Sequence, residues 1–274
     1  MFASGKYAAT MGELDCSVII PVYNRWDYTS SCLQGIMDSV EKVAEVIVVD
    51  NGSTDETAGQ LQKFPSVKVI AYSTNQGCAK AWNAGLKVSR ATKWKIFLNN
   101  DVLLPAWALS GLLESAERWG FGVVCPAMWQ GEIDYDIESL SVSLRVTLKD
   151  YPRMGFLHGV CFAVRADVFE KVGLFDENFV LGQYEDSDFF RRVKLAPYLV
   201  GTVSDSFLHH FGSVTQLAIR DEVKLDYASA NKIYFRKKWK LGWWKRKFER
   251  VMLFADIRAW EARERKLAGC VMVR

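Results

Sequence analysis

Short, nearly continuous apolar runs recur along the first hundred residues and alternate with longer helix-like stretches. The runs cover residues 16–23, 45–50, 67–72 and 94–98. The helix-like stretches between them cover residues 27–42, 54–64 and 76–89. Apolar runs this short are typical of strands that are covered on both faces, as in a parallel sheet. The repeated strand–helix order therefore predicts a doubly wound α/β fold.

The pattern changes after residue 101. We expect, in order, a helix near 105–119, a strand at 122–128, an irregular and antiparallel region to about residue 165, and short helices near 166–172 and 184–195. From about residue 221 the sequence is helical and basic to its end. The second half is therefore not expected to repeat the regular alternation of the first.

Polar residues follow three of the predicted strands, in the clusters 21–25, 50–55 and 99–101. Each cluster alone is typical of an ordinary turn, because Asn, Asp, Gly and Ser favour turns. In open α/β sheets, however, ligands bind beyond the carboxyl ends of the strands. Three such clusters at one sheet edge therefore predict a ligand site.

The glycine-rich signatures of other nucleotide-binding folds are missing. No GxGxxG follows the first predicted strand and no GxxxxGK[ST] occurs, which argues against a dinucleotide-binding fold and a P-loop NTPase. A diphosphate bound at this edge would need another positive partner. A divalent cation held by carboxylate oxygen is the natural candidate, because hard cations prefer such ligands and neutralise phosphate charge.

Composition narrows the cellular setting. The 274 residues are 50% hydrophobic, enough for one sizeable core, and the formal net charge is only +3. Six cysteines lie far apart with no CxxC pair, which favours reduced thiols over a disulfide framework or a zinc site. No signal peptide is expected, and no apolar run approaches the roughly 20 residues that span a bilayer. We therefore expect a cytoplasmic protein that is soluble or peripherally bound at the membrane.

Six segments, taken together, resemble a known family. They are VIIPVYNR, VIVVDNGSTDET, NQGCAKAWNAGL, FLNNDV, GVCFAVRADVFEKVGLFDENF and GQYEDSDFFRR, in this order between about residues 15 and 215. The chain thereby resembles family 2 glycosyltransferases with the GT-A fold, in which a central, mainly parallel sheet is flanked by helices. Each segment alone is weakly specific, whereas the ordered combination is highly specific.

The resemblance implies a donor nucleotide site and a metal site. The residues that it assigns to the base and ribose pocket and its neighbouring segments are Pro21, Tyr23, Asn24, Asp50, Asn51, Asn75, Gly77, Lys80, Asn83, Asn99 and Asn100. Residues 99–101 match the family's DxD motif, so Asp101 is expected to bind Mn²⁺ or Mg²⁺. Asn99 departs from that motif, because an amide there removes one formal negative charge from the site.

An acidic pair begins the predicted helix near residue 184. The resemblance implies that Asp186 is the general base, which an inverting displacement needs because the attacking hydroxyl must lose a proton. Adjacent helical residues point to different sides, so Glu185 is expected to orient the acceptor instead. Asp188 lies four residues before Arg192 and is expected to form an ion pair with it rather than to act in catalysis.

Two adjacent histidines, His209 and His210, precede Gly212. In the family a histidine near such a glycine often reaches the metal or the diphosphate, and imidazole is an acceptable ligand for manganese-like ions. Its spacing to Gly212 favours His210 over His209. A structural role remains the alternative for each of them.

Residues 232–250 read KIYFRKKWKLGWWKRKFER and place Trp239, Trp243, Trp244 and Phe248 near helical spacing among basic residues. Three interpretations stay open. The helix can pack its aromatic residues on the catalytic domain, lie in an anionic membrane interface, or grip nucleic-acid phosphate with aromatic stacking. Nucleic acid is the least favoured partner of the three.

These observations lead to one hypothesis. An N-terminal tail (1–14) precedes a catalytic domain (15–220) with a donor-binding half (15–101) and an acceptor-binding half (102–220), and a basic helical extension (221–274) follows. The expected reaction is inverting transfer from a UDP-, dTDP- or GDP-sugar to a saccharide or lipid-linked acceptor, in cell-surface polysaccharide or glycolipid synthesis. The alternatives are a degenerate sugar-nucleotide-binding module, for which Asn99 argues, a transferase acting on nucleic acid or protein, and a nucleotidyltransferase, which would normally carry the missing phosphate loop.

Overall fold

The structure of this chain is a computed structural model that describes residues 12–212 and 226–274. Most of the predicted N-terminal tail, 1–14, lies outside these residues. The predicted boundary between residues 220 and 221 also lies outside them.

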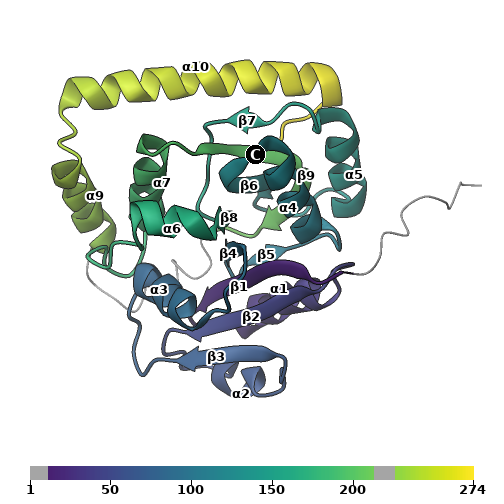
Figure 1. Ribbon diagram of the computed structural model, residues 1–274, viewed down its shortest axis with the longest axis vertical. Coiled ribbons are helices and arrows are strands. Elements are labelled where there is room, and N and C mark those ends of the chain that lie inside the picture. The colour runs from purple at the N-terminus through teal and green to yellow at the C-terminus, as the bar shows by residue number, and fades with distance from the viewer. Residues whose placement is uncertain (1–11, 213–225) are drawn as a thin grey trace, which may run out of the picture.

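Strands and helices alternate through the first half of the described chain (Figure 1). The strands are β1 (Leu14–Val22), β2 (Val43–Asp50), β3 (Val67–Ala71), β4 (Trp94–Leu98), β5 (Val102–Leu103), β6 (Phe121–Gln130), β7 (Arg153–Met154), β8 (Cys161–Arg165) and β9 (Leu199–His210). The helices are α1 (Trp26–Met37), α2 (Thr57–Leu61), α3 (Cys78–Val88), α4 (Ala108–Trp119), α5 (Ile137–Leu148), α6 (Ala166–Val172), α7 (Glu185–Leu195), α9 (Tyr227–Lys238) and α10 (Trp243–Ala268).

The first four strands in the sheet form its parallel part, in the order β3-β2-β1-β4. Both faces of β1 are covered, because Val18 and Ile20 pack in the core with α1 and α4, whereas Ile19 packs in the core with α3 and α7. Burial on both faces explains why the strand is a nearly continuous apolar run. The predicted doubly wound arrangement is confirmed for this half.

The remaining strands make the sheet mixed. The order continues β8-β6-β9-β5, with β8 antiparallel to both of its neighbours and β6 parallel to β9. The prediction of irregular structure is wrong for 137–148, which form α5. The helix begins after Asp136, whose carboxylate accepts a hydrogen bond from the backbone N–H of Ser139. This is an ordinary N-cap.

The C-terminal residues return to the sheet after two helices. α10 lies across one side of the molecule (Figure 1), and residues that follow it pair with β6 through Met128 and Met272. A bidentate ion pair between Arg153 and Glu264, both almost fully buried, fixes the last turns of α10. The helical prediction for this region is confirmed. In the ranges that the structure describes, no helix is both long and apolar enough to cross a membrane.

Candidate active site

A cavity of about 330 Å³ opens at the carboxyl ends of β1, β2 and β4. Its walls are formed by Pro21, Val22, Tyr23, Asn51, Asn75, Cys78, Trp82, residues 99–101, Gly159, Val160, residues 181–186, His210 and Tyr227. The structure thus brings together the three polar clusters that the sequence places after successive strands. A cavity of this size is ordinary for a small-molecule site.

Two residues assigned to the nucleotide support the pocket rather than line it. The side-chain oxygen of Asn24 accepts hydrogen bonds from the backbone N–H groups of Thr54 and Asp55. The carboxylate of Asp50 accepts one from the backbone of Ser53, at 2.9 Å. Both side chains are buried, and together they hold the turn that presents Asn51 to the cavity.

The segment before α3 contacts the loop that precedes α7, at Leu181. Gly77 has φ +88°, and a Cβ there would lie 2.8 Å from the backbone nitrogen of Leu181, so only glycine permits this approach. The N–H of Cys78 donates to the carbonyl of Leu181 at 2.7 Å. Asn75 lines the cavity, whereas Lys80 is exposed outside it and Asn83 donates to the carbonyl of Phe175.

Asp101 and His210 face each other at one end of the cavity. The Nε2 atom of His210 lies 3.2 Å from Oδ1 of Asp101, and both side chains are almost fully buried. That nitrogen has no well-aligned hydrogen-bond partner among the described residues. The Nδ1 atom of His210 lies 3.3 Å from Oε1 of Gln130. The amide nitrogen of Asn100 donates a hydrogen bond to the hydroxyl of Thr29.

The two adjacent histidines face opposite sides of β9, because successive strand residues alternate. His210 lines the cavity, whereas His209 does not. The Nδ1 atom of His209 lies 2.7 Å from the hydroxyl of Tyr135, which precedes α5. Of the two histidines, only His210 is placed to share a ligand with Asp101.

A divalent cation fits the Asp101–His210 pair chemically. Carboxylate oxygen and imidazole nitrogen suit ions such as Mn²⁺, and Nε2 of His210 lies close to the Asp101 carboxylate without a well-aligned hydrogen bond to it. Across 12–212 and 226–274, no group of three or more His, Cys, Asp or Glu side chains could hold a metal. Among the described residues, Asp101 and His210 would therefore be the two side chains that contact such an ion.

Glu185 and Asp186 begin α7 and line the same cavity. Oδ1 of Asp186 accepts the backbone N–H of Ser187 at 2.6 Å, and its Oδ2 lies against Gly159, where an added Cβ would be only 2.2 Å away. Glu185 lies on the side of Cys78. Burial raises the pKa of both carboxyls, and the neighbouring charge of Asp186 raises that of Glu185 further.

The loop that joins α6 to α7, directly before this pair, is strained and held by α9. Leu181, Gln183 and Tyr184 all have positive φ angles, between 58° and 76°, which non-glycine residues adopt at a cost. The side chain of Asn231 accepts from the N–H of Val180 and donates to the carbonyls of residues 180, 182 and 183, at 2.7–3.1 Å. No local sequence signal pointed to this loop or to Asn231, because the contact joins residues about fifty positions apart.

We expect Asn231→Asp to destabilise the protein and to slow catalysis. The new oxygen would face carbonyl oxygens that now accept hydrogen bonds, so the free energy of unfolding should fall by about 1–3 kcal/mol. Urea denaturation measures this change. Lys232→Ala, at an exposed neighbouring position of α9, is the control and should leave the midpoint unchanged. An unchanged denaturation midpoint in Asn231→Asp would show that the hydrogen bonds of Asn231 to residues 180–183 do not contribute to stability.

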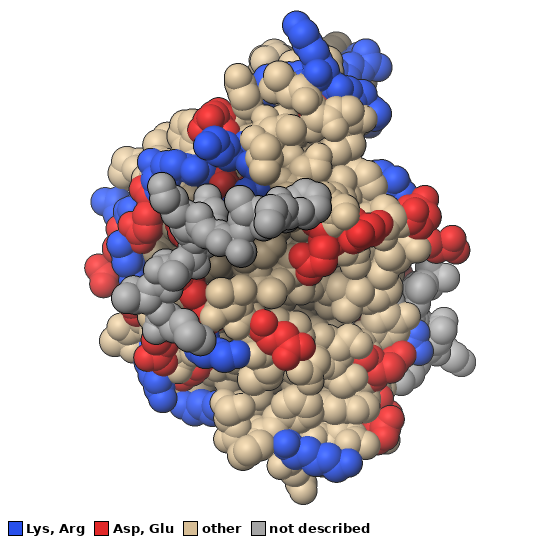
Figure 2. Space-filling model, turned by 90° about the vertical axis from the view of Figure 1, so that its right-hand side faces the viewer, with Lys and Arg blue, Asp and Glu red and all other residues tan. Residues whose placement is uncertain are grey.

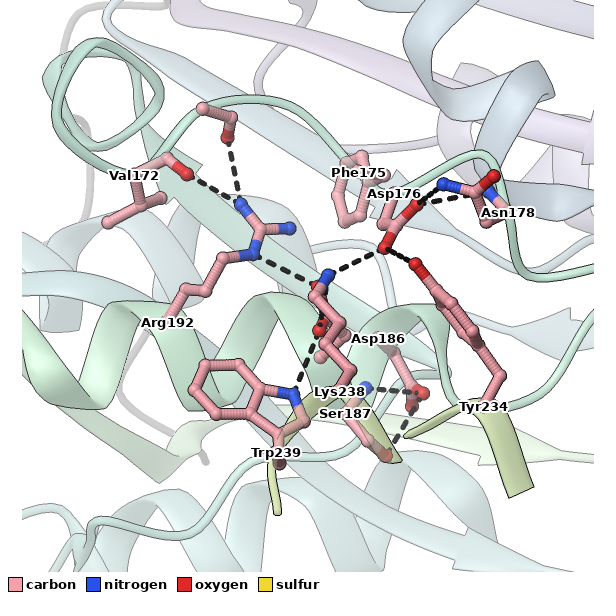
Figure 3. A network of polar contacts seen from close by, with 12 residues as sticks. Val172, Phe175, Asp176, Asn178, Asp186, Ser187, Arg192, Tyr234, Lys238 and Trp239 are labelled. Atoms are coloured by element: carbon pink, nitrogen blue, oxygen red, sulfur yellow. Dashed lines mark hydrogen bonds and ion pairs between the residues drawn. The ribbon is translucent and has the colours of Figure 1, made fainter. Parts of the chain in front are cut away.

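Asp188 stabilises the contact between α7 and α9. Its carboxylate, fully buried, accepts hydrogen bonds from Arg192 and from the indole of Trp239 and pairs with Lys238. Figure 3 shows Arg192, Lys238 and Trp239 in this network, with Asp176 and Tyr234 on its other side. The predicted ion pair of Asp188 with Arg192 is confirmed. Lys238 also contacts Asp176 at 2.6 Å, so α9 is tied to the domain next to the helix that carries Asp186.

Comparison with known proteins identifies similar chains. A family described as "Glycosyl transferase family 2" matches residues 17–173. An uncharacterized glycosyltransferase of Rickettsia prowazekii is 27% identical over 175 residues, which cover 59% of this chain and 54% of that protein. An N-acetylglucosaminyl-diphospho-decaprenol L-rhamnosyltransferase of Mycobacterium tuberculosis is 26% identical over 231 residues, 70% of this chain and 75% of that protein. The match thus spans only about half the length of the Rickettsia protein.

A solved structure is similar in fold. The mannosyltransferase PcManGT from Pyrobaculum calidifontis, in complex with GDP-Man and Mn²⁺, superposes with a TM-score of 0.57. The two chains are 19% identical, and the superposition covers 72% of this chain and 57% of that one. An identity this low supports a common fold and carries no residue role.

Proposed function

Because the chain belongs to glycosyl transferase family 2, we propose that it is an inverting glycosyltransferase that uses a nucleoside-diphosphate sugar. Its fold is GT-A. One observation carries the proposal: a single cavity is lined by the Asp101–His210 pair and by the half-buried Asp186, whose carboxylate lies beside Gly159. This arrangement provides separate groups for the leaving diphosphate and for the attacking hydroxyl.

The donor occupies the wall formed by the three polar clusters, 21–25, 50–55 and 99–101. Pro21, Tyr23 and Asn51 border the base and ribose, and Asn99 and Asn100 lie beside the ribose and sugar. A UDP-, dTDP- or GDP-sugar is the donor class. The similarity to a mannosyltransferase solved with GDP-Man supports a nucleotide sugar and does not select among these donors.

Asp101 and His210 would hold Mn²⁺ or Mg²⁺ when the donor is bound. Such an ion would supply positive charge that stabilises the diphosphate as a leaving group. Since Asn99 contributes no charge, Asp101 would be the carboxylate of the 99–101 motif that holds the ion, and retention of the ion would depend strongly on the donor itself. Mn²⁺ in the solved mannosyltransferase complex supports this choice of cofactor.

Asp186 acts as the general base in a single displacement. The acceptor oxygen bonds to the anomeric carbon as the bond to the diphosphate breaks, and the hydroxyl proton passes to Asp186. The backbone N–H of Ser187 fixes one oxygen of this carboxylate. Glu185, which lies beside Cys78, orients the acceptor.

The pH dependence of transfer follows from the pKa of this base. Burial raises the pKa of Asp186, and only the deprotonated form accepts a proton. Activity should therefore fall with decreasing pH through this raised pKa, at a higher pH than the value of about 3.9 for an ordinary aspartate. A profile of kcat/KM against pH tests this. An acidic limb near or below 3.9 would contradict the assignment.

We place the acceptor among saccharides and lipid-linked sugars of cell-surface polysaccharide or glycolipid synthesis. The similarity to a rhamnosyltransferase named for a diphospho-decaprenol acceptor supports this class. Such an acceptor would bring the reaction to the cytosolic face of a membrane.

Release of nucleoside diphosphate tests the proposal. The protein is incubated with a series of nucleotide sugars and Mn²⁺, with and without saccharide and lipid-linked acceptors. We expect one donor to release its diphosphate faster when the right acceptor is present. Donor binding without any transfer or hydrolysis would instead support a degenerate binding module, the alternative that Asn99 favours.

A further inference from the structure

Helix α10 contacts the rest of the protein along one side only. Glu249 pairs with Arg191, and Glu264 pairs with the buried Arg153. Trp260 packs edge-on against Phe156 at 5.9 Å. Residues 249, 260 and 264 are 11 and 4 positions apart and therefore share one face of the helix. This face is the one turned toward the domain.

The opposite face carries an apolar stripe. Trp244, Phe248, Val251 and Met252, followed by Ala255 and Ala259, recur at spacings of three and four residues. The first four side chains are 75%, 66%, 56% and 48% exposed. Trp243, Leu253 and Phe254 are also 46–58% exposed and lie beside this row, so the exposed apolar surface of α10 is wider than the stripe. Because a contiguous row of exposed large apolar side chains on a soluble domain marks an interaction surface, the stripe needs a partner.

This result corrects the extent of the predicted amphipathic segment. Trp239, which the sequence groups with the later tryptophans, donates its indole N–H to Asp188 and belongs to the domain. The break at Lys240, with φ 47°, and Gly242 separates it from α10. The exposed stripe is thus a property of α10 alone and extends past residue 250 to Ala259.

Basic residues flank the stripe. Helical spacing places Lys247 and Arg258 along one edge and Lys245 along the other. Residues 243–259 contain five Lys and Arg and two acidic residues, so this one segment carries as much net positive charge as the whole chain. In Figure 2, Lys and Arg side chains gather at the top of the molecule, the level at which α10 lies in Figure 1.

We propose that the stripe of Trp244, Phe248, Val251 and Met252 docks on a membrane surface rich in anionic lipid. The apolar side chains enter the interface while the flanking cations contact lipid phosphate, as in interfacial amphipathic helices. A second copy of the chain fits less well, because pairing two stripes would bring their basic edges together. The inference is independent of the transfer reaction.

Vesicle flotation at low salt tests the proposal with the full chain. The vesicles are phosphatidylcholine alone or phosphatidylcholine with about one third phosphatidylglycerol. We expect binding only to the anionic vesicles. The double variant Trp244→Ser with Phe248→Ser should bind the anionic vesicles at least about tenfold more weakly than the wild type. Lys245→Gln with Lys247→Gln should weaken binding by about thirtyfold, because each cation contributes near an anionic surface.

Val40→Ser is the matched control, since Val40 is 57% exposed and lies between α1 and β2. It should bind like the wild type, and all variants should keep the wild-type melting temperature. Equal binding to neutral vesicles, or wild-type binding by the Trp244/Phe248 variant, would overturn the proposal. So would a dimer in sedimentation that the same substitutions abolish, or binding of DNA without binding of vesicles. None of these outcomes would change the diphosphate-release assay.

Discussion

Asp186→Asn should lower the rate of sugar transfer by about a hundredfold to ten-thousandfold and leave donor binding unchanged. That range is the usual contribution of a positioned general base. The amide matches the carboxylate in shape, and its oxygen can still accept the N–H of Ser187, which lies 2.6 Å from the carboxylate now. It cannot take up the proton of the acceptor. The loss should therefore appear in kcat, because the proton is taken up only during the displacement and not when the donor binds.

The measurement combines diphosphate release at saturating donor with donor affinity from thermal shift. Asp27→Asn is the matched control, because Asp27 is an exposed carboxylate in the first turn of α1, outside the cavity. It should retain full activity. If Asp186→Asn also retains full transfer, the base is a different group, and Glu185→Gln identifies it by losing the activity instead.

Asp101→Ala should abolish the metal dependence of donor binding, the second large effect. Its carboxylate lies 3.2 Å from the imidazole of His210 and provides the negative charge of this pair. Loss of a residue that only hydrogen-bonds to a metal ligand typically lowers metal affinity 10- to 100-fold. Loss of the carboxylate ligand itself should therefore lower metal affinity by at least about a hundredfold. Asn99→Asp adds a charge beside the same position and should preserve or tighten binding.

Both variants are measured as the shift in melting temperature produced by donor with and without Mn²⁺. The pair is informative because the two substitutions change the charge of one site in opposite directions. If Asp101→Ala keeps the Mn²⁺-dependent shift of the wild type, the ion binds elsewhere. In that case Asn99→Asp should have no effect on the shift.

Local patterns were enough to predict the parallel half of the fold. The strands β1, β2 and β4 are buried on both faces, so each appears as an apolar run bounded by polar turn residues. Because parallel strands end at the same edge, their following turns had to converge, and Asn51 and Asp101 do line one cavity. The order of elements alone therefore predicted at which edge of the sheet this cavity lies.

Contacts between distant residues could not be predicted in this way. Asn24 and Asp50 lie at the ends of strands, as ligand-binding residues often do. Their side chains nevertheless accept hydrogen bonds from backbone N–H groups of one turn. The choice between His209 and His210 depends on the face of β9 that turns inward, which its all-buried pattern does not reveal. Asn231 holds the 180–184 loop from another helix.

A thermal-shift panel of nucleotide sugars with and without Mn²⁺ tests most directly whether this cavity is a metal-dependent donor site. A ligand at a hundred times its Kd stabilises the native state by about 2.7 kcal/mol. We predict that one UDP-, dTDP- or GDP-sugar raises the melting temperature of the wild-type protein, and that the rise requires Mn²⁺ or Mg²⁺. If no nucleotide sugar at millimolar concentration raises it with either ion, the account of the site is contradicted.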